Sequence, residues 1–201
     1  MSDCGCEMEV CNALERKTLL RVLGINAFMF VFEMILGLLA QSTGLIADSL
    51  DMFADASVYA ISLYAVGKSS ELKAASAKLS GYAQILLALL VLADALRRFI
   101  FGSEPVSGFM MGVGAIALLA NVTCLYLIAK HREGGVHMRA SYIFSTNDVI
   151  ANVGVILAGV LVWLLKSSYP DLVIGLVIAF VVLRGGFQIL KEASEQSKGL
   201  S

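Results

Sequence analysis

Long apolar stretches alternate with short polar joints along the whole chain. Six stretches are long enough to cross a hydrocarbon core of about 30 Å, which takes about 20 helical residues. They cover residues 18–40, 42–66, 78–100, 106–130, 139–165 and 169–192. Lipid leaves open backbone groups unsatisfied, and the second half of the chain shows no alternation typical of barrel strands. The pattern therefore predicts an all-α membrane protein with six transmembrane helices.

The composition agrees with this prediction and excludes several other classes. The chain has 201 residues, of which 58% are hydrophobic and 15% are charged. Soluble domains contain about 45–50% apolar and about 25% charged residues, and one core of this size could not bury the excess. Disorder and a secreted disulfide scaffold are excluded for the same reason. The formal net charge of −1 provides no basic field for nucleic acid, so the expected surroundings are a lipid bilayer.

Lysine and arginine gather at one end of the predicted spans. Eleven of the 15 lie at or beyond the same ends of the spans: around the start of the first span, between the second and third, between the fourth and fifth, and around the end of the sixth. The other four are Arg97, Arg98, Lys166 and Arg184. The positive-inside rule therefore predicts that both termini are cytoplasmic. Three segments follow: a cytoplasmic N-terminal tail at 1–17, which lacks the apolar core of a signal peptide, a six-helix transmembrane domain at 18–192, and a short cytoplasmic tail at 193–201.

Acidic side chains stand inside the predicted spans, where lipid should exclude them. Asp48, Asp51 and Asp55 are spaced by three and four residues, so they share one face of the second span. At 1.5 Å per residue, Asp51 and Asp148 of the antiparallel fifth span both lie about 14 Å deep, near the midplane. Carboxylates crowded at that depth cannot all stay ionised without a cation. We predict that a divalent metal and protons occupy this site in turn, which would couple their movements.

Four further polar or acidic residues of the spans could act together with these carboxylates. Asn26 and Glu33 are seven residues apart and share a face of the first span, and Asn152 follows Asp148 by one turn. Asp48, Asn152, Glu33 and Asn26 are expected to support the metal site or carry protons. For Asp48 and Glu33, a purely structural hydrogen-bonding role stays open.

Two short sequence patterns in the spans predict structural contacts rather than ion binding. Asp94 precedes Arg97 and Arg98 by three and four residues, which predicts an ion pair on the helix surface. Gly108 and Gly112 form a Gly-x-x-x-Gly pair, which predicts close packing of two helices.

Three cysteines, Cys4, Cys6 and Cys11, cluster ahead of the first span. On the cytoplasmic side these thiols should stay reduced, and they would suit a soft metal such as zinc, cadmium or Cu(I). Their spacing fits no structural zinc motif, which normally needs four ligands. Metal capture that feeds the transport site and a disordered tail with incidental cysteines both remain open.

The segment from Ser42 to Asp55 resembles the second helix of the cation diffusion facilitator family. That helix carries a small polar run, then Leu-x-Ala-Asp, then His/Asp-x-x-x-Asp. Asp51 and Asp55 fall on its two metal-ligand positions, and Asp48 falls on the preceding acid. The resemblance extends over residues from about 18 to 192. It includes Asn26 and Glu33 of the first span and Asp148 and Asn152 of the fifth.

The resemblance implies a homodimer of six-helix protomers in the inner (plasma) membrane of a bacterium. Such a protein exports divalent metal, usually zinc, from the cytoplasm in exchange for protons, and needs no cofactor besides the transported ion. Phe144 occupies the first ligand position of the fifth helix and cannot bind metal. The expected ligands are therefore Asp51, Asp55, Asp148 and the amide of Asn147, with Asn152 as a further candidate for an amide oxygen. An all-oxygen set also suits manganese, magnesium or cobalt, so the metal stays open.

The chain differs from usual members of this family in its length. The family's usual cytoplasmic C-terminal domain has no counterpart in this chain, which predicts a small member whose dimer rests on its membrane helices.

Two other function classes fit the sequence less well. A membrane-embedded, metal-dependent phosphotransferase needs two clustered aspartate pairs with intervening glycine and Ala-Arg, whereas Met52 and Phe53 follow Asp51 here. A passive cation channel favours an acidic ring and a continuous polar pore, whereas these acids are clustered. The chain has no nucleotide-binding motif, which agrees with a secondary transporter.

Overall fold

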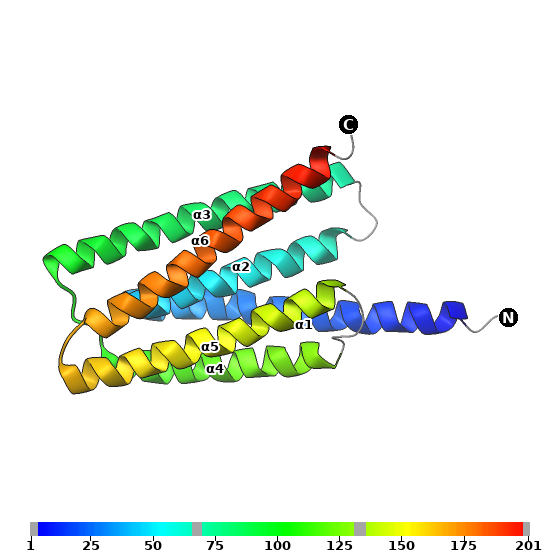
Figure 1. Cartoon of the computed structure of the whole chain (residues 1–201). Helices are drawn as coiled ribbons and strands as arrows, with labels where there is room; N and C mark the ends of the chain where they lie inside the picture. The colour runs from blue at the N-terminus through cyan, green and yellow to red at the C-terminus, as the bar shows by residue number, and fades with distance from the viewer. Residues whose placement is uncertain (1–3, 66–69, 131–135, 199–201) are drawn as a thin grey trace.

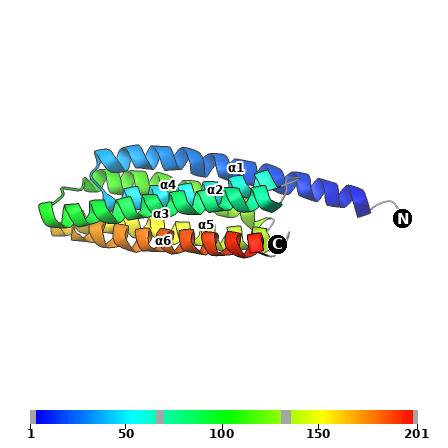
Figure 2. The same cartoon turned by 90° about the horizontal axis from the view of Figure 1, so that it is seen from above.

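The computed structural model describes residues 4–65, 70–130 and 136–198, which form six helices with roughly parallel axes (Figure 1). The helices are α1 (Cys4–Leu39), α2 (Thr43–Ala65), α3 (Ser70–Phe101), α4 (Ser107–Ala129), α5 (Val136–Leu165) and α6 (Tyr169–Lys198). The all-α fold class is therefore confirmed, and each predicted span overlaps one helix. Because α1 begins at Cys4, it continues into the predicted N-terminal tail and projects beyond the other helices (Figure 2).

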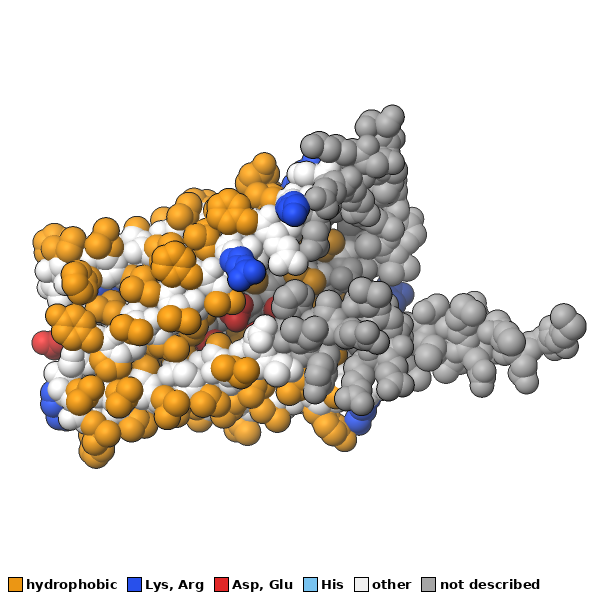
Figure 3. Space-filling model, viewed as in Figure 1, with side chains coloured by type: hydrophobic (Ala, Val, Ile, Leu, Met, Phe, Trp, Pro, Cys, Tyr) orange, Lys and Arg blue, Asp and Glu red, His pale blue; other side chains and the backbone are white. Residues whose placement is uncertain are grey.

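Five helices of the described chain are long and apolar enough to cross a membrane. The spans are Arg16–Leu39, Lys78–Phe101, Ser107–Ala129, Ser145–Leu165 and Tyr169–Lys191. Large apolar side chains cover the outside of the bundle (Figure 3), and Phe28, Leu90 and Phe180 are each more than half exposed. A continuous apolar surface of this kind requires lipid around it. The chain is therefore a multi-pass integral membrane protein.

The remaining helix, α2, lies at the centre of the bundle. It contacts each of the other five helices, whereas α3 contacts only α2 and α6 among the described helices. Leu45, Leu50 and Met52 of α2 are almost completely buried. Leu50 belongs to an apolar core that also includes Val113 of α4 and Val155 of α5. The acids of α2 are consequently held inside the protein rather than against lipid.

Glycines bring α6 close to its neighbours. A Cβ atom at Gly186 would lie 2.8 Å from Ile85 of α3, and one at Gly175 would lie 2.7 Å from Thr43 of α2. Only glycine permits such an approach, and small residues serve the same purpose in many membrane helix pairs. At Gly108 and Gly112 a Cβ atom would meet nothing within 4 Å. The prediction of close packing there is wrong for the helices of this chain, because both positions face outward.

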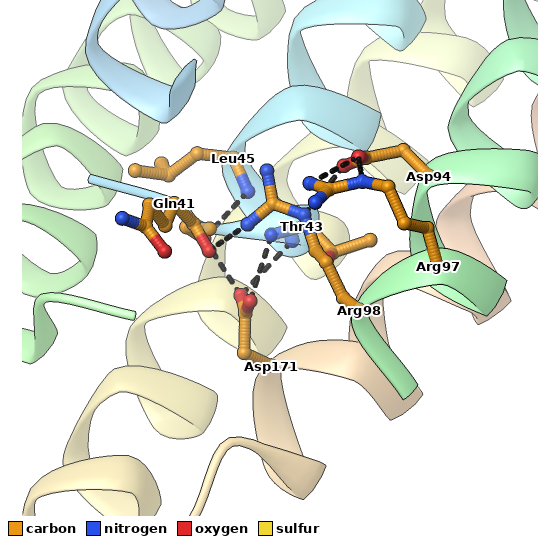
Figure 4. A network of polar contacts seen from close by, with 9 residues as sticks. Gln41, Thr43, Leu45, Asp94, Arg97, Arg98 and Asp171 are labelled. Atoms are coloured by element: carbon orange, nitrogen blue, oxygen red, sulfur yellow. Dashed lines mark hydrogen bonds and ion pairs between the residues drawn. The ribbon is translucent and has the colours of Figure 1, made fainter. Parts of the chain in front are cut away.

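The first residues of α2 are held by an acid from the far end of the sequence (Figure 4). Asp171, at the start of α6, is fully buried. Its carboxylate accepts hydrogen bonds from the Ser42 hydroxyl at 2.6 Å and from the backbone N–H groups of Thr43 at 2.7 Å and Gly44 at 3.0 Å. The first N–H groups of a helix have no partner within the helix, so Asp171 caps α2 from α6.

The turn before α2 is also held by α3. Gln41 adopts the left-handed backbone conformation, with φ of 52°, and the buried Arg98 donates a hydrogen bond to its carbonyl. Arg98 also pairs with Asp94, which forms a second ion pair with Arg97 at 2.9 Å (Figure 4). The predicted ion pair of Asp94 is confirmed. Together with Asp171, these contacts fix where α2 begins and hence how deep its acids lie.

Candidate metal centre

Three carboxylates from two helices meet in the interior of the bundle. Asp51 and Asp55 lie one turn apart on α2, and Asp148 faces them from α5. The Asp148 carboxyl lies within hydrogen-bonding reach of both α2 carboxyls. Asp55 and Asp148 are 7% and 5% exposed, whereas Asp51 is half-buried. The site is therefore enclosed but open on the side of Asp51, and acidic atoms are visible midway along the face in Figure 3.

These carboxylates have no basic partner among the described residues. Within the described part of the chain, the only ion pairs are those of Asp94 with Arg97 and Arg98. Acids buried together need protons or a bound cation to balance their charge. In this conformation, no three His, Cys, Asp or Glu side chains of the described residues are arranged to hold one ion. The three carboxylates are neighbours but do not form a ready-made set of three ligands in this conformation.

The two asparagines of α5 have different surroundings. Asn147 is exposed, whereas Asn152 is fully buried. The Asn152 side-chain amide donates to the Asp148 carbonyl at 2.8 Å and to Asp48 at 3.5 Å. Adjacent helix residues point about 100° apart, so Asn147 cannot share the inward face of Asp148. Asn147 thus lies on the exposed side of α5, whereas Asn152 contacts the acid-bearing region through Asp48 and the Asp148 backbone.

A second pair of acids lies beside the three carboxylates. Glu33 of α1 and Asp48 of α2 are both fully buried, and their carboxyl groups lie within hydrogen-bonding reach of each other. Neither oxygen of Glu33 has a hydrogen-bond donor, and one oxygen of Asp48 also lacks one. Two carboxyl groups at this separation need a proton or a cation between them. The structure thus joins the predicted Glu33 and Asp48 into one pair.

Asn26 does not join either group of acids. Its side-chain amide donates to the Val22 carbonyl at 2.9 Å and to the Cys124 sulfur of α4 at 3.8 Å. Its own carbonyl oxygen is buried without a partner. Asn26 therefore links α1 to α4, about two turns from Glu33 on the same helix.

Tyr59 is a site residue that the sequence did not single out. It follows Asp55 by one turn of α2 and is 1% exposed, and its hydroxyl donates to the Asp55 carboxylate at 3.3 Å. The same spacing of four residues that identified Asp51 and Asp55 would have found it. The side chains of Cys4, Cys6, Cys11 and Phe144 lie outside the described residues.

Comparison with protein families supplies the decisive observation. Residues 19–196 match the model of the cation efflux transmembrane domain. The chain belongs to the cation efflux family. The match includes every acid of the site and confirms the resemblance to cation diffusion facilitators. It describes a transport domain rather than a catalytic one.

Known members of the cation efflux family resemble the chain over most of its length. The zinc transporter ZitB of Yersinia pseudotuberculosis is 28% identical over 191 residues, which is 88% of this chain and 61% of that protein. The ZitB of Escherichia coli is 24% identical over 190 residues, with the same coverage. The cadmium, cobalt and zinc/H(+)-K(+) antiporter of Bacillus velezensis is 26% identical over 184 residues, 84% of this chain and 58% of that protein. The chain thus spans about three fifths of the length of these relatives.

Proposed function

We propose that the chain exports divalent metal ions from the cytoplasm in exchange for protons. The observation that carries this proposal is the meeting of Asp51, Asp55 and Asp148 inside a membrane bundle without a basic partner among the described residues. Membership of the cation efflux family supports the direction and the class of substrate. The names of the relatives support zinc, cadmium and cobalt as candidate metals and a proton as the exchanged ion.

The proposed topology has six spans, both termini in the cytoplasm, and the inner (plasma) membrane of a bacterium as the location. α2 is the sixth span, because its 23 residues reach about 34 Å and lie within five helices that lipid surrounds. Lysine and arginine then lie mainly on the cytoplasmic side, as the positive-inside rule requires. Asp51 and Asp148 lie near the midplane, where transporters of many folds bind their ions.

In the proposed metal site, Asp51, Asp55 and Asp148 provide charged oxygen ligands. Asn152 rather than Asn147 supplies the nearby amide, because Asn147 is exposed. The carboxylates are proposed to move together when they bind one ion, because they do not form a ready-made set of three ligands in this conformation. A site whose carboxylates come together only when metal binds is expected in a transporter that alternates between conformations. Oxygen donors accept zinc and cadmium and suit cobalt and manganese.

Proton coupling follows from competition for the same oxygens. A carboxyl group must be deprotonated to act as a charged metal ligand, so metal binding releases protons. Glu33 and Asp48 are proposed to share a proton beside the metal site, where Asn152 connects Asp48 with the backbone at Asp148. The exchange requires that metal and protons favour different conformations of the bundle.

Two further elements of the proposal concern other parts of the molecule. Two copies are proposed to form a homodimer through their membrane helices. Cys4, Cys6 and Cys11 are proposed to capture metal ahead of the transport site.

Metal binding to the purified chain tests the site. Zinc, cadmium, cobalt and manganese are titrated by calorimetry into the wild type and into Asp51→Asn, Asp55→Asn and Asp148→Asn. Each variant should bind at least tenfold more weakly, because it removes one charged ligand. Glu104→Gln is the matched control, since it removes an exposed acid outside the bundle core. Wild-type affinity in all three variants would overturn the site.

A further inference from the structure

A groove runs between α1 and α4 on the outside of the bundle. Its volume is about 620 Å³, and it is lined by six residues of α1 between Leu20 and Met29 and four of α4 between Leu119 and Leu127. It lies in the half of the bundle that contains the N-terminal part of α1, away from the turn before α2. Phe28 and Leu119 on its rim are 68% and 69% exposed, so the groove faces the surrounding lipid.

The chemistry of the lining restricts what can fill the groove. Among the side chains that line the groove, Arg21 carries a charge and Thr123 carries a hydroxyl, and the other eight residues are apolar or glycine. The Thr123 hydroxyl already donates to the Leu119 carbonyl at 2.7 Å. Arg21 is exposed and forms no ion pair with an acid of the described residues. A complementary ligand is therefore apolar along most of its length and anionic at the end beside Arg21.

Gly24 keeps the groove open. A Cβ atom at Gly24 would meet nothing within 4 Å, in contrast to Gly175 and Gly186, which other helices approach closely. Glycine is less favourable than alanine inside a helix, and no close helix contact explains it at this position. The missing side chain leaves space in the wall of the groove.

We propose that the groove binds an acyl chain of an anionic phospholipid, with the lipid phosphate at Arg21. Arg21 precedes Leu39 by 18 residues, which places it about 27 Å along α1, close to the full thickness of the hydrocarbon core. Its side chain can thus extend to the phosphate level of the leaflet on the N-terminal side. Guanidinium groups bind phosphate through paired, charge-assisted hydrogen bonds. A lipid phosphate supplies the negative charge that the groove lining itself lacks beside Arg21, so charge complementarity favours an anionic lipid.

Lipid binding to the purified full chain tests the proposal. The chain is exchanged into micelles containing phosphatidylglycerol or phosphatidylcholine, and the lipids retained are counted by native mass spectrometry. We expect about fivefold better retention of phosphatidylglycerol, the effect of one basic residue at an anionic surface. Arg21→Gln should abolish this preference, whereas Lys17→Gln, an exposed basic residue outside the groove, should keep it.

Substitutions that fill the groove with a larger side chain test whether it binds the acyl chain. Gly24→Leu should reduce retention of both lipids, and Thr123→Leu should do the same from the opposite wall if Gly24→Leu folds poorly. Gly112→Leu is the control, because it adds the same side chain at another open glycine. Equal effects of Arg21→Gln and Lys17→Gln, or unchanged retention in both filled variants, would overturn the proposal. A filled variant that turns a dimer into a monomer without changing lipid retention would instead assign the groove to a second copy.

Discussion

Replacing Asp171 with alanine should remove the cap at the start of α2 and lower the stability of the protein. The fully buried carboxylate accepts three hydrogen bonds, from Ser42, Thr43 and Gly44. Alanine leaves the N–H groups of Thr43 and Gly44 without these acceptors at a buried helix start. The Ser42 hydroxyl also accepts a hydrogen bond from the Leu45 N–H at 3.1 Å, so its position is disturbed as well.

The size of the effect can be bounded from these contacts. Side-chain hydrogen bonds in membranes contribute about 0.6 kcal/mol on average, which gives about 2 kcal/mol for three. Hydrogen bonds to charged groups contribute about 1.5–3 kcal/mol each in soluble proteins, but removing a buried charge also removes its desolvation penalty. We therefore expect Asp171→Ala to lower the free energy of unfolding by about 2–4 kcal/mol. Asp171→Asn keeps one acceptor oxygen and should lose about half as much.

Reversible unfolding in mixed micelles, followed by circular dichroism, measures this loss. Glu104→Gln serves as the control for removing an acid from an exposed position. A loss below about 0.5 kcal/mol for Asp171→Ala, within the range of ordinary surface substitutions, would refute the assigned role of the cap.

Three further predictions concern transport. Initial rates measured between pH 6 and 8 should show the KM for metal rising as the loading side becomes more acidic, by roughly tenfold per pH unit for each displaced proton; a pH-independent KM would contradict competition. Glu33→Gln should change metal affinity less than threefold but slow antiport at least tenfold, because it removes one member of the pair with Asp48; an unchanged antiport rate would exclude a proton role for Glu33. Asn152→Ala should weaken metal binding about 10–100-fold in calorimetry, as losses beside metal ligands do, while Asn147→Ala should change it less than twofold; the reverse order would restore Asn147 as the ligand.

The helices and the main acid cluster could be predicted because their signals are local. Apolar stretches of the length that a membrane needs predict where helices lie, and the spacing of Asp48, Asp51 and Asp55 puts them on one face. The ion pair of Asp94 was predictable for the same reason. The early start of α1 at Cys4 was not, because residues 4–17 carry charges that end the apolar pattern.

The remaining features depend on contacts between distant segments. Asp171 is an ordinary acid at a helix start in the sequence, and its partners lie 127–129 residues away. Asn147 and Asn152 look equally suitable beside Asp148, and only the rotation of α5 separates them. The outward position of Gly108 and Gly112 likewise depends on how α4 is turned, which a short motif does not specify.

Simultaneous recording of metal and protons tests the central claim most directly. The chain is reconstituted into vesicles that contain a metal dye and a pH dye, the membrane voltage is clamped, and zinc is added outside. Exchange predicts that metal entry is accompanied by a rise in internal pH, and that both signals disappear in Asp51→Asn. Metal entry without a change in internal pH, or with undiminished rate in Asp51→Asn, would contradict a proton-coupled exchange at these carboxylates.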